Sequence, residues 1–301
     1  MSPDQKDISE FLRPETVSRL ANMDLRARFI VEGFIAGLHK SPYHGFSVEF
    51  AEYRQYNAGE SIRNIDWKIY AKTDRYYTKI FEDETNLSAT LLLDRSASMD
   101  FGSSEITKLR YGTLLSAALA YLMIKQRDAV GLAVFDEKIV EMVPHRSIKR
   151  HLFHLMKTLE NITPGAMTEI SNTLHQIAER IKRRGLIILI SDLFDDSERV
   201  ISGLKHFRHR GQEIVIFHLL DPMEISLDYR GEVRFVDSET GEKIRTQPWF
   251  LKKEYREDLG RWIHDLETAC RENAIDYNLI TIDTSFDKAL FSYLSKRRRM
   301  R

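Results

Sequence analysis

One short segment of the chain places oxygen-bearing side chains at a regular spacing. The apolar run 91–93 ends at Asp94, and two hydroxyl side chains follow at alternate positions, Ser96 and Ser98. If the run is a buried strand, these side chains lie at the carboxyl end of a sheet, where open α/β folds bind their ligands. One carboxylate and two hydroxyls suit a hard divalent cation such as Mg²⁺ better than zinc or copper.

Two further oxygen donors are expected near this segment. Thr168 lies in a short loop just before a predicted helix, and Asp192 directly follows a second apolar run, 186–191. Neighbouring strands of a doubly wound sheet would bring Asp192 close to Asp94. Mg²⁺ takes six oxygen ligands and usually keeps some waters, so these five side chains leave room for an acidic group from a partner. We therefore expect Mg²⁺ as the cofactor, with Mn²⁺ and Ca²⁺ as alternatives.

The elements that must position these residues form an alternating pattern. Continuous apolar strands alternating with helices from residue 88 onward predict an α/β fold, a doubly wound, mostly parallel sheet with helices on both faces. The predicted strands are 89–93, 130–135, 139–143, 186–191, 213–220 and 277–282. The predicted helices are 105–126, 147–160, 169–182, 196–209, 249–273 and 286–295. A polar excursion at 225–246 predicts a short β-hairpin that turns at 239–241.

The N-terminal part of the chain has a different pattern. Apolar residues at steps of three and four predict one amphipathic helix over 15–38, docked on the main core. Alternating residues between 46 and 84 predict a small β-rich region. We therefore divide the chain into an N-terminal helical and β-rich appendage, 1–85, and a main domain, 86–301.

Composition excludes several classes of protein. The 301 residues carry 45 basic and 45 acidic side chains, so the overall charge does not favour nucleic acid as a partner. The single cysteine, Cys270, excludes an internal disulfide and fits a reducing compartment. No apolar run approaches the ~20 residues of a membrane span, and the first ten residues are polar. The sequence therefore predicts a cytoplasmic protein without a membrane span.

At this point the residues resemble a known pattern. Asp94, Ser96, Ser98, Thr168 and Asp192 resemble the metal-ion-dependent adhesion site (MIDAS) of von Willebrand factor type A domains. The whole chain resembles the bacterial "domain of unknown function 58" family, a branch of that superfamily, through segments 50–68, 94–99 and 191–192. Two features depart from the family pattern. Ala166-Met167-Thr168 replaces the commoner Gly-Gly-Thr, and the paired membrane spans of some members do not precede segment 50–68.

The resemblance implies a function and roles for individual residues. Ser96, Ser98 and Thr168 would bind the metal directly, and Asp94 and Asp192 would act largely through water. The implied function is non-enzymatic: the metal grips a carboxylate on a protein partner, and the implied partner is a MoxR-type AAA+ ATPase. The chain has no Gly-x-x-x-x-Gly-Lys-Ser/Thr loop, so ATP hydrolysis would have to come from that partner.

A second segment has no metal or nucleophile chemistry of its own. Arg63, Asp66, Trp67 and Lys68 either form a buried ion pair beneath a tryptophan or present a partner-binding surface, since Trp and Arg are common at binding hot spots. The buried ion pair is the favoured interpretation, and the partner-binding surface remains open as the alternative.

Two other interpretations of the metal segment need comparison. An EF-hand would begin at Asp94, but its sixth position is Met99 where that loop needs glycine, so we reject it. A Mg²⁺-dependent hydrolase, a phosphatase or nuclease, could use Asp94 and Asp192 to hold a metal and activate water. The phosphatase pattern has a second Asp where Ser96 stands, and no histidine lies in the three metal segments, so binding is favoured over catalysis.

Overall fold

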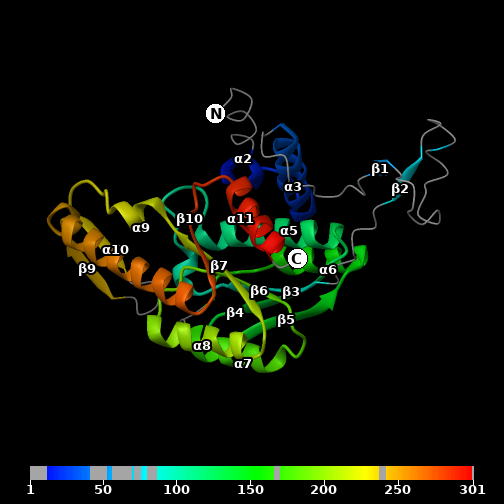
Figure 1. Cartoon of the computed structure of the whole chain (residues 1–301). Coiled ribbons are helices and arrows are strands. Elements are labelled where there is room, and N and C mark those ends of the chain that lie inside the picture. Colours follow the sequence, from blue (N-terminus) through cyan, green and yellow to red (C-terminus); the bar gives the residue numbers. More distant parts are fainter. Residues whose placement is uncertain are drawn as a thin grey trace.

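The computed structural model describes residues 12–40, 53–55, 70, 76–79, 87–165, 170–236 and 242–299. Its centre is a six-stranded sheet in the order β10-β7-β6-β3-β4-β5 (Figure 1). The strands are β3 (Ser88–Asp94), β4 (Ala129–Phe135), β5 (Ile139–Arg146), β6 (Leu186–Ser191), β7 (Glu213–Leu220) and β10 (Asp276–Thr281). Every neighbouring pair is parallel except the β4–β5 hairpin at one edge. The predicted doubly wound, mostly parallel sheet is confirmed.

The order of the strands determines where a ligand can bind. From β3 the chain adds β4 and β5 on one side, and it then returns to add β6, β7 and β10 on the other. The direction of winding therefore reverses between β3 and β6. Open α/β sheets bind ligands beyond the carboxyl ends of their strands at such a reversal.

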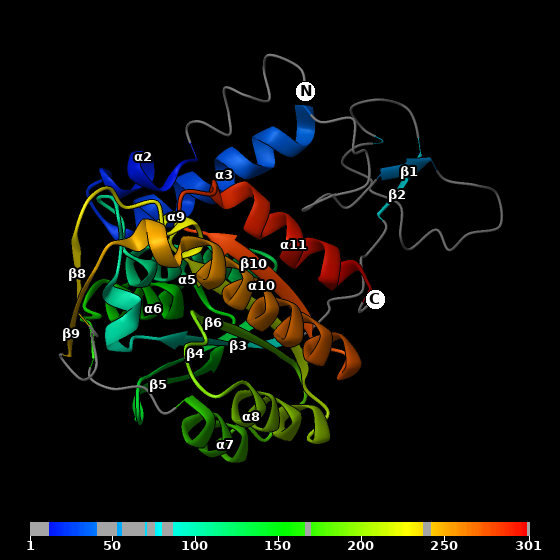
Figure 2. The ribbon, with the colours of Figure 1, turned by 90° about the vertical axis from the view of Figure 1, so that its left-hand side faces the viewer.

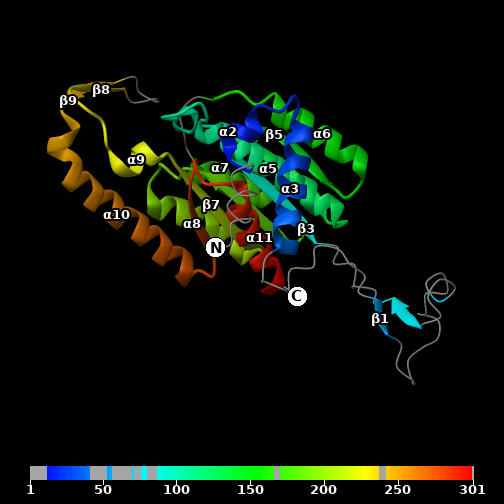
Figure 3. The same ribbon diagram turned by 90° about the horizontal axis from the view of Figure 1, so that it is seen from above.

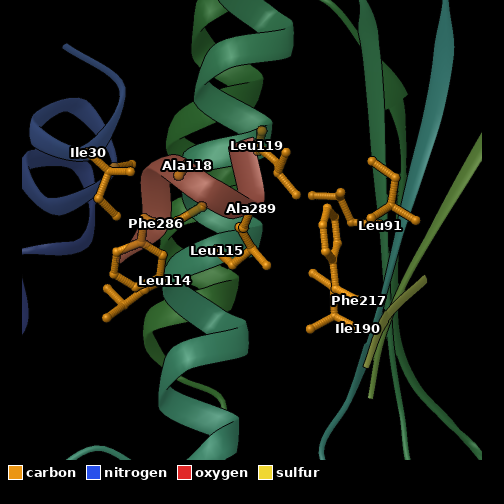
Figure 4. Close-up of a cluster of buried hydrophobic side chains, with 14 of the residues drawn as sticks. Ile30, Leu91, Leu114, Leu115, Ala118, Leu119, Ile190, Phe217, Phe286 and Ala289 are labelled. Carbon is orange, nitrogen blue, oxygen red and sulfur yellow. The ribbon is translucent and has the colours of Figure 1, made fainter. Parts of the chain in front are cut away.

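Helices cover both faces of this sheet. On one face lie α3 (Met23–Lys40), α5 (Lys108–Lys125), α6 (Lys149–Glu160) and α11 (Phe286–Arg299), and on the other lie α7 (Ile170–Arg180), α8 (Ser197–His209) and α10 (Pro248–Glu272). Successive strand residues point to opposite faces, so Leu91 and Leu93 join the first core whereas Leu92 joins the second. Figure 4 shows α5 packed between the sheet and helices α3 and α11.

The structure corrects the prediction of one helix over 15–38. It has two, α2 (Pro14–Ser18) and α3, separated by a short turn. The side chain of Asn22 accepts a hydrogen bond from the backbone N–H of Leu25 at 2.9 Å, which caps the start of α3. The apolar spacing continues across this turn, so periodicity alone does not show the break. Ile30, Val31 and Phe34 of α3 pack in the first core, as expected for a docked helix.

The excursion between β7 and β10 contains one more helix than predicted. A short helix, α9 (Pro222–Ser226), comes first, and the predicted hairpin follows as β8 (Val233–Val236) and β9 (Lys243–Thr246). Asp221 and Glu224 form a capping box at the start of α9. The side chain of each residue accepts a hydrogen bond from the backbone N–H of the other. The predicted turn at 239–241 lies outside the described residues.

The β-rich N-terminal region is described only in part. Strands β1 (Tyr53–Gln55) and β2 (Tyr77–Lys79) pair antiparallel, with Tyr53 opposite Lys79. The division into an appendage and a main domain stays a prediction. No helix within the described residues is both long and apolar enough to cross a membrane.

Candidate metal centre

The carboxyl ends of β3 and β6 bring two carboxylates to one edge of the sheet. The two strands are parallel neighbours in which Leu93 lies opposite Ile190, so the chain leaves the sheet at Asp94 on one strand and at Ser191-Asp192 on the next. Asp94, Ser191 and Asp192 are fully buried. The sequence-based expectation that these two strands are neighbours is therefore confirmed.

Asp94 is held by hydrogen bonds from both strand ends. Its Oδ1 accepts the backbone N–H of Ser96 at 2.8 Å, and its Oδ2 accepts the hydroxyl of Ser191 at 2.6 Å. Burial and, next, the nearby charge of Asp192 raise the pKa of Asp94 to about 7, although these hydrogen bonds act to lower it. When Asp94 is ionised, both of its hydrogen bonds thus come from neutral donors and neither comes from a cation.

The two hydroxyls that follow Asp94 are brought together by a short 3₁₀ turn, η2 (Ala97–Asp100). Ser96 is buried and Ser98 is half-buried, and their Oγ atoms lie 3.1 Å apart. Of the two hydroxyl-bearing residues, Ser98 is therefore the one that solvent reaches. Hydroxyl and carboxylate oxygens of this kind match the donor set that Mg²⁺ prefers.

Asp192 has a partner that the sequence did not suggest. Its Oδ2 accepts a hydrogen bond from Nζ of Lys108 at 2.7 Å, and the same ammonium donates to Oε1 of Glu224 at 2.6 Å. Burial lowers the pKa of Lys108, but the charges of Asp192 and Glu224 outweigh it and the net direction is upward. The aromatic rings of Phe194 and Phe101 flank the ammonium, with centroids 4.7 and 5.9 Å away.

The turn after β6 fixes the direction of these side chains. Leu193 adopts a left-handed backbone with φ of 55°, which is uncommon for a residue other than glycine. Its N–H donates to the Oγ of Ser191 at 2.9 Å, and this bond helps to hold the turn. Asp192 then points to Lys108 while Phe194 covers the ammonium.

The charges of the two buried aspartates, half-buried Glu224 and Lys108 do not balance. Asp94, Asp192 and Glu224 are three carboxylates, and Lys108 is the one cation that bonds to any of them within the described residues. When all three carboxylates are ionised, the group is two positive charges short of neutrality, and protonation of Asp94 or a bound divalent cation would reduce that excess. Burying unbalanced charge is costly, so the residues fit such an ion.

The loop between α6 and α7 is fastened beside this site. The guanidinium of Arg95 pairs with Asp136 at 2.9 Å and donates to the carbonyl of Thr163, and the N–H of Gly165 donates to the carbonyl of Arg95 at 2.6 Å. The loop therefore approaches the chain between Asp94 and Ser96. Thr168, the fifth predicted ligand, lies outside the described residues.

The structure leaves some predicted residues untested and adds others. Arg63, Asp66, Trp67 and Lys68 lie outside the described residues. Lys108, Ser191 and Glu224 were missed, because a lysine in an apolar helix, a serine ending a strand and a glutamate in a polar excursion show no pattern together. The capping spacing of Asp221 and Glu224 was the one available signal.

The histidines give no evidence for a metal site of another kind. Across the described part of the chain, no group of three or more His, Cys, Asp and Glu side chains could hold a metal ion. His218 lies near Asp192 on β7, but burial lowers its pKa to about 4 and its Nδ1 lies 2.5 Å from the hydroxyl of Tyr277. His218 is therefore neutral at pH 7 and packed in the interior.

Comparisons with known proteins place the chain among uncharacterised relatives. The model of the family "Protein of unknown function DUF58" matches residues 52–263. The uncharacterized protein Rv1480 of Mycobacterium tuberculosis is 24% identical over 233 residues, covering 76% of this chain and 72% of the relative. The conserved hypothetical protein BatB from Bacteroides thetaiotaomicron is similar in structure, with a TM-score of 0.46, 16% identity, and coverage of 71% of this chain and 100% of that chain. The SpRpn10 VWA domain gives a TM-score of 0.38 and 12% identity, covering 70% and 94%.

Proposed function

We propose that this chain, which belongs to the DUF58 family, is a non-enzymatic protein-binding module that uses a divalent metal to grip a carboxylate of a partner. One observation carries the proposal most directly. Asp94, Ser96, Ser98 and Asp192 lie at the reversal of the sheet, and with half-buried Glu224 the carboxylates there outnumber the one bonded cation, Lys108, by two. A divalent cation would balance that group.

The chemistry of the donors supports Mg²⁺, with Mn²⁺ or Ca²⁺ as substitutes. Hydroxyl oxygens of Ser96, Ser98 and Thr168 would hold the ion directly, and Asp94 and Asp192 would do so largely through water. When bound, the ion supplies a hard Lewis-acid centre that attracts a carboxylate oxygen. Because the direct protein ligands are neutral hydroxyls, the ion can accept a carboxylate oxygen of a partner as a further ligand. Half-buried Ser98 marks the side from which that group would arrive.

The residues of the chain also limit what the site does. Lys108 donates to one oxygen of Asp192 and fixes its orientation, and no histidine lies in the three metal segments to act as a general base. We therefore favour binding over hydrolysis. The proposed partner is a MoxR-type AAA+ ATPase in a chaperone-like or assembly role in the cytoplasm.

Affinity capture with and without the metal tests this proposal. The full chain would be immobilised and incubated with lysate of its source cell, in MgCl₂ or in EDTA, and bound proteins would be identified by mass spectrometry. Ser98→Ala, which removes one half-buried hydroxyl, would be compared with Ser202→Ala, which removes an exposed hydroxyl on α8. Asp94→Ala is a second variant of the site.

We expect an AAA+ ATPase to be captured in MgCl₂ by the wild type and by Ser202→Ala, and to be lost in EDTA and from both site variants. If all samples capture the same proteins, the metal site is not the binding surface. In that case Arg63–Lys68 becomes the surface to test, and the hydrolase alternative calls for an activity screen.

A further inference from the structure

A large apolar cavity lies directly beside the candidate metal centre. Its volume is about 940 Å³, it is partly open to solvent, and it is lined by residues of η2, α9, the β8–β9 hairpin and the start of α10. Its apolar lining includes Phe101, Phe194, Leu227, Phe235, Ile244 and Leu251. Figures 2 and 3 show these elements gathered at one end of the molecule, with the hairpin standing beyond the end of the sheet.

The cavity and the metal centre share residues. Ser98, a predicted metal ligand, lines the cavity, and so does Glu224, which holds Lys108. Phe101 and Phe194 form part of the cavity wall and also flank the ammonium of Lys108. A ligand at Ser98 would therefore touch the metal centre and the cavity at the same time.

The excursion that builds the cavity is fixed to the main domain. The hydroxyl of Tyr255 on α10 donates to the carbonyl of Glu224 at 2.6 Å, and Lys252 pairs with Asp228 at 2.7 Å. Lys108 connects Glu224 of α9 to Asp192 at the end of β6. These bonds join the wall of the cavity to the edge of the sheet that carries the metal centre.

Apolar side chains around this cavity are exposed to solvent. Ile244 is 64% exposed, Val236 is 50% exposed and Leu251 is 46% exposed, although all three line the cavity. Phe250, 66% exposed, stands one helical turn before Glu254, which is another lining residue. An apolar surface that continues from a cavity onto its rim is typical of a site for a protein segment.

We propose that this cavity receives a large apolar side chain of the partner, next to the acidic residue that the metal centre grips. The occupant is thus a partner segment in which one Asp or Glu lies within about three positions of a Phe, Leu, Ile or Trp, the reach of roughly 10 Å that an extended chain allows. This inference rests on the proposed function and names the chemistry of its ligand.

The charges of the cavity further restrict that segment. Asp100, Glu254 and Asp258 line the cavity together with Glu224. Lys108 compensates Glu224, and Arg261 pairs with Asp258, but Asp100 and Glu254 form no ion pair within the described residues. These carboxylates would repel a second acid in the segment. The partner sequence is therefore expected to have a single acid flanked by apolar and neutral or basic residues.

Selection from a random dodecapeptide library tests the inference. Phage-displayed peptides would be selected on the full chain in MgCl₂, and the most enriched peptide would be synthesised with a fluorescein label. Its dissociation constant would be measured by fluorescence polarisation on the wild type, Ile244→Lys, Leu251→Lys and Asp94→Asn. Phe153→Lys is the matched control, because Phe153 is 71% exposed on α6, at the other end of the molecule from β9 in Figures 1 and 3.

We expect enriched peptides to contain one acid beside a large apolar residue. Ile244→Lys and Leu251→Lys should each weaken binding about tenfold or more, as should replacement of the peptide's apolar residue by alanine, and Phe153→Lys should not. Asp94→Asn and EDTA should abolish binding.

The contrary outcomes separate the two proposals. Suppose that the peptides need Mg²⁺ and Asp94 but bind the cavity variants as tightly as the wild type. That result overturns this inference and leaves the proposed function standing. Suppose instead that the peptides need the cavity but bind as tightly in EDTA as in MgCl₂, and as tightly to Asp94→Asn as to the wild type. That result overturns the proposed function. A selection that enriches no peptide overturns this inference, because it finds no segment for which the cavity is a site.

Discussion

At the scale of single residues, the centre is organised around one buried lysine and three carboxylates. Lys108 satisfies one oxygen of Asp192 and one of Glu224, whereas Asp94 receives only neutral donors, the N–H of Ser96 and the hydroxyl of Ser191. Asp94 is therefore the residue that gains most from a cation. Burial and then the charge of Asp192 raise the pKa of Asp94 to about 7, and a bound cation would oppose both effects.

Replacing Asp94 by asparagine should change the stability of the protein by different amounts with and without metal. In EDTA, the pKa of Asp94 is about 4 in the unfolded chain and about 7 in the folded one. Protonated Asp94 therefore contributes fully to stability below about pH 4, and that contribution is lost as the pH rises through about 7. Above pH 7, Asp94→Asn should therefore be more stable than the wild type, by up to about 4 kcal/mol. In excess MgCl₂ this advantage of the variant should shrink, because binding at 100 times the dissociation constant adds about 2.7 kcal/mol to the wild type alone.

Urea denaturation followed by circular dichroism, at several pH values and with each additive, measures both effects. A wild type whose stability in EDTA is unchanged between about pH 4 and 8 would contradict the charge deficit. A variant that MgCl₂ stabilises as much as it does the wild type would contradict a metal site at Asp94.

At the scale of elements, the site depends on loops that the sheet holds at fixed positions. The α6–α7 loop is tied down through Arg95, Asp136 and Gly165, next to the chain between Asp94 and Ser96. Gly165 is needed for this close approach, since a Cβ atom there would lie 2.5 Å from Oδ2 of Asp136 and 3.2 Å from Nε of Arg95. The position of this loop is thus set by the packing of Gly165 against Asp136 and Arg95, rather than by the binding of a metal ligand.

Gly165→Ala should loosen the loop. The added methyl must displace the Arg95–Asp136 pair, so we expect a loss of about 1–3 kcal/mol of stability and weaker metal-dependent binding. Gly260→Ala is the matched control, since a Cβ there meets nothing within 4 Å and alanine favours the interior of α10 by roughly 0.5–1 kcal/mol. Thermal denaturation of both variants measures the difference, and equal melting temperatures would contradict the close approach.

The elements also show how far the sequence predicts the structure. The strands that end at Asp94 and Ser191 were predicted because unbroken apolar runs indicate strands buried on both faces. The break at Asn22 and the helix α9 were not, because capping side chains act over a few residues and leave apolar periodicity unchanged. The Lys108–Asp192–Glu224 contacts join residues 84 and 116 positions apart, so only the folded chain brings them together.

At the scale of the whole molecule, two cores on opposite faces of one sheet hold the metal centre at a rigid edge. The second core includes Cys270, which is buried on α10 among residues of α7, α8 and β7. Burial and the charge of Glu267 raise the pKa of this thiol to about 12. Cys270 is therefore protonated at neutral pH and acts as an apolar core residue.

Cys270 should report the opening of this core. Because the thiolate is the reactive form, reaction with Ellman's reagent at about pH 8 should require unfolding and should be far slower in native buffer than in urea. Reaction rates across a urea series should follow the fraction unfolded measured by circular dichroism. Complete reaction within seconds in native buffer would show that the second core is open.

The central claim is that Asp94, Ser96, Ser98 and Asp192 belong to one divalent-metal site, and Mn²⁺ binding tests it most directly. Electron paramagnetic resonance measures free Mn²⁺, so its loss during titration counts bound ions without a partner or an assay of function. We expect one ion per wild-type chain, displaced by Mg²⁺, and no binding to Asp94→Asn or Ser98→Ala while Ser202→Ala binds as the wild type does. A wild type that binds no Mn²⁺, or site variants that bind it with unchanged affinity, would contradict the assignment of this site.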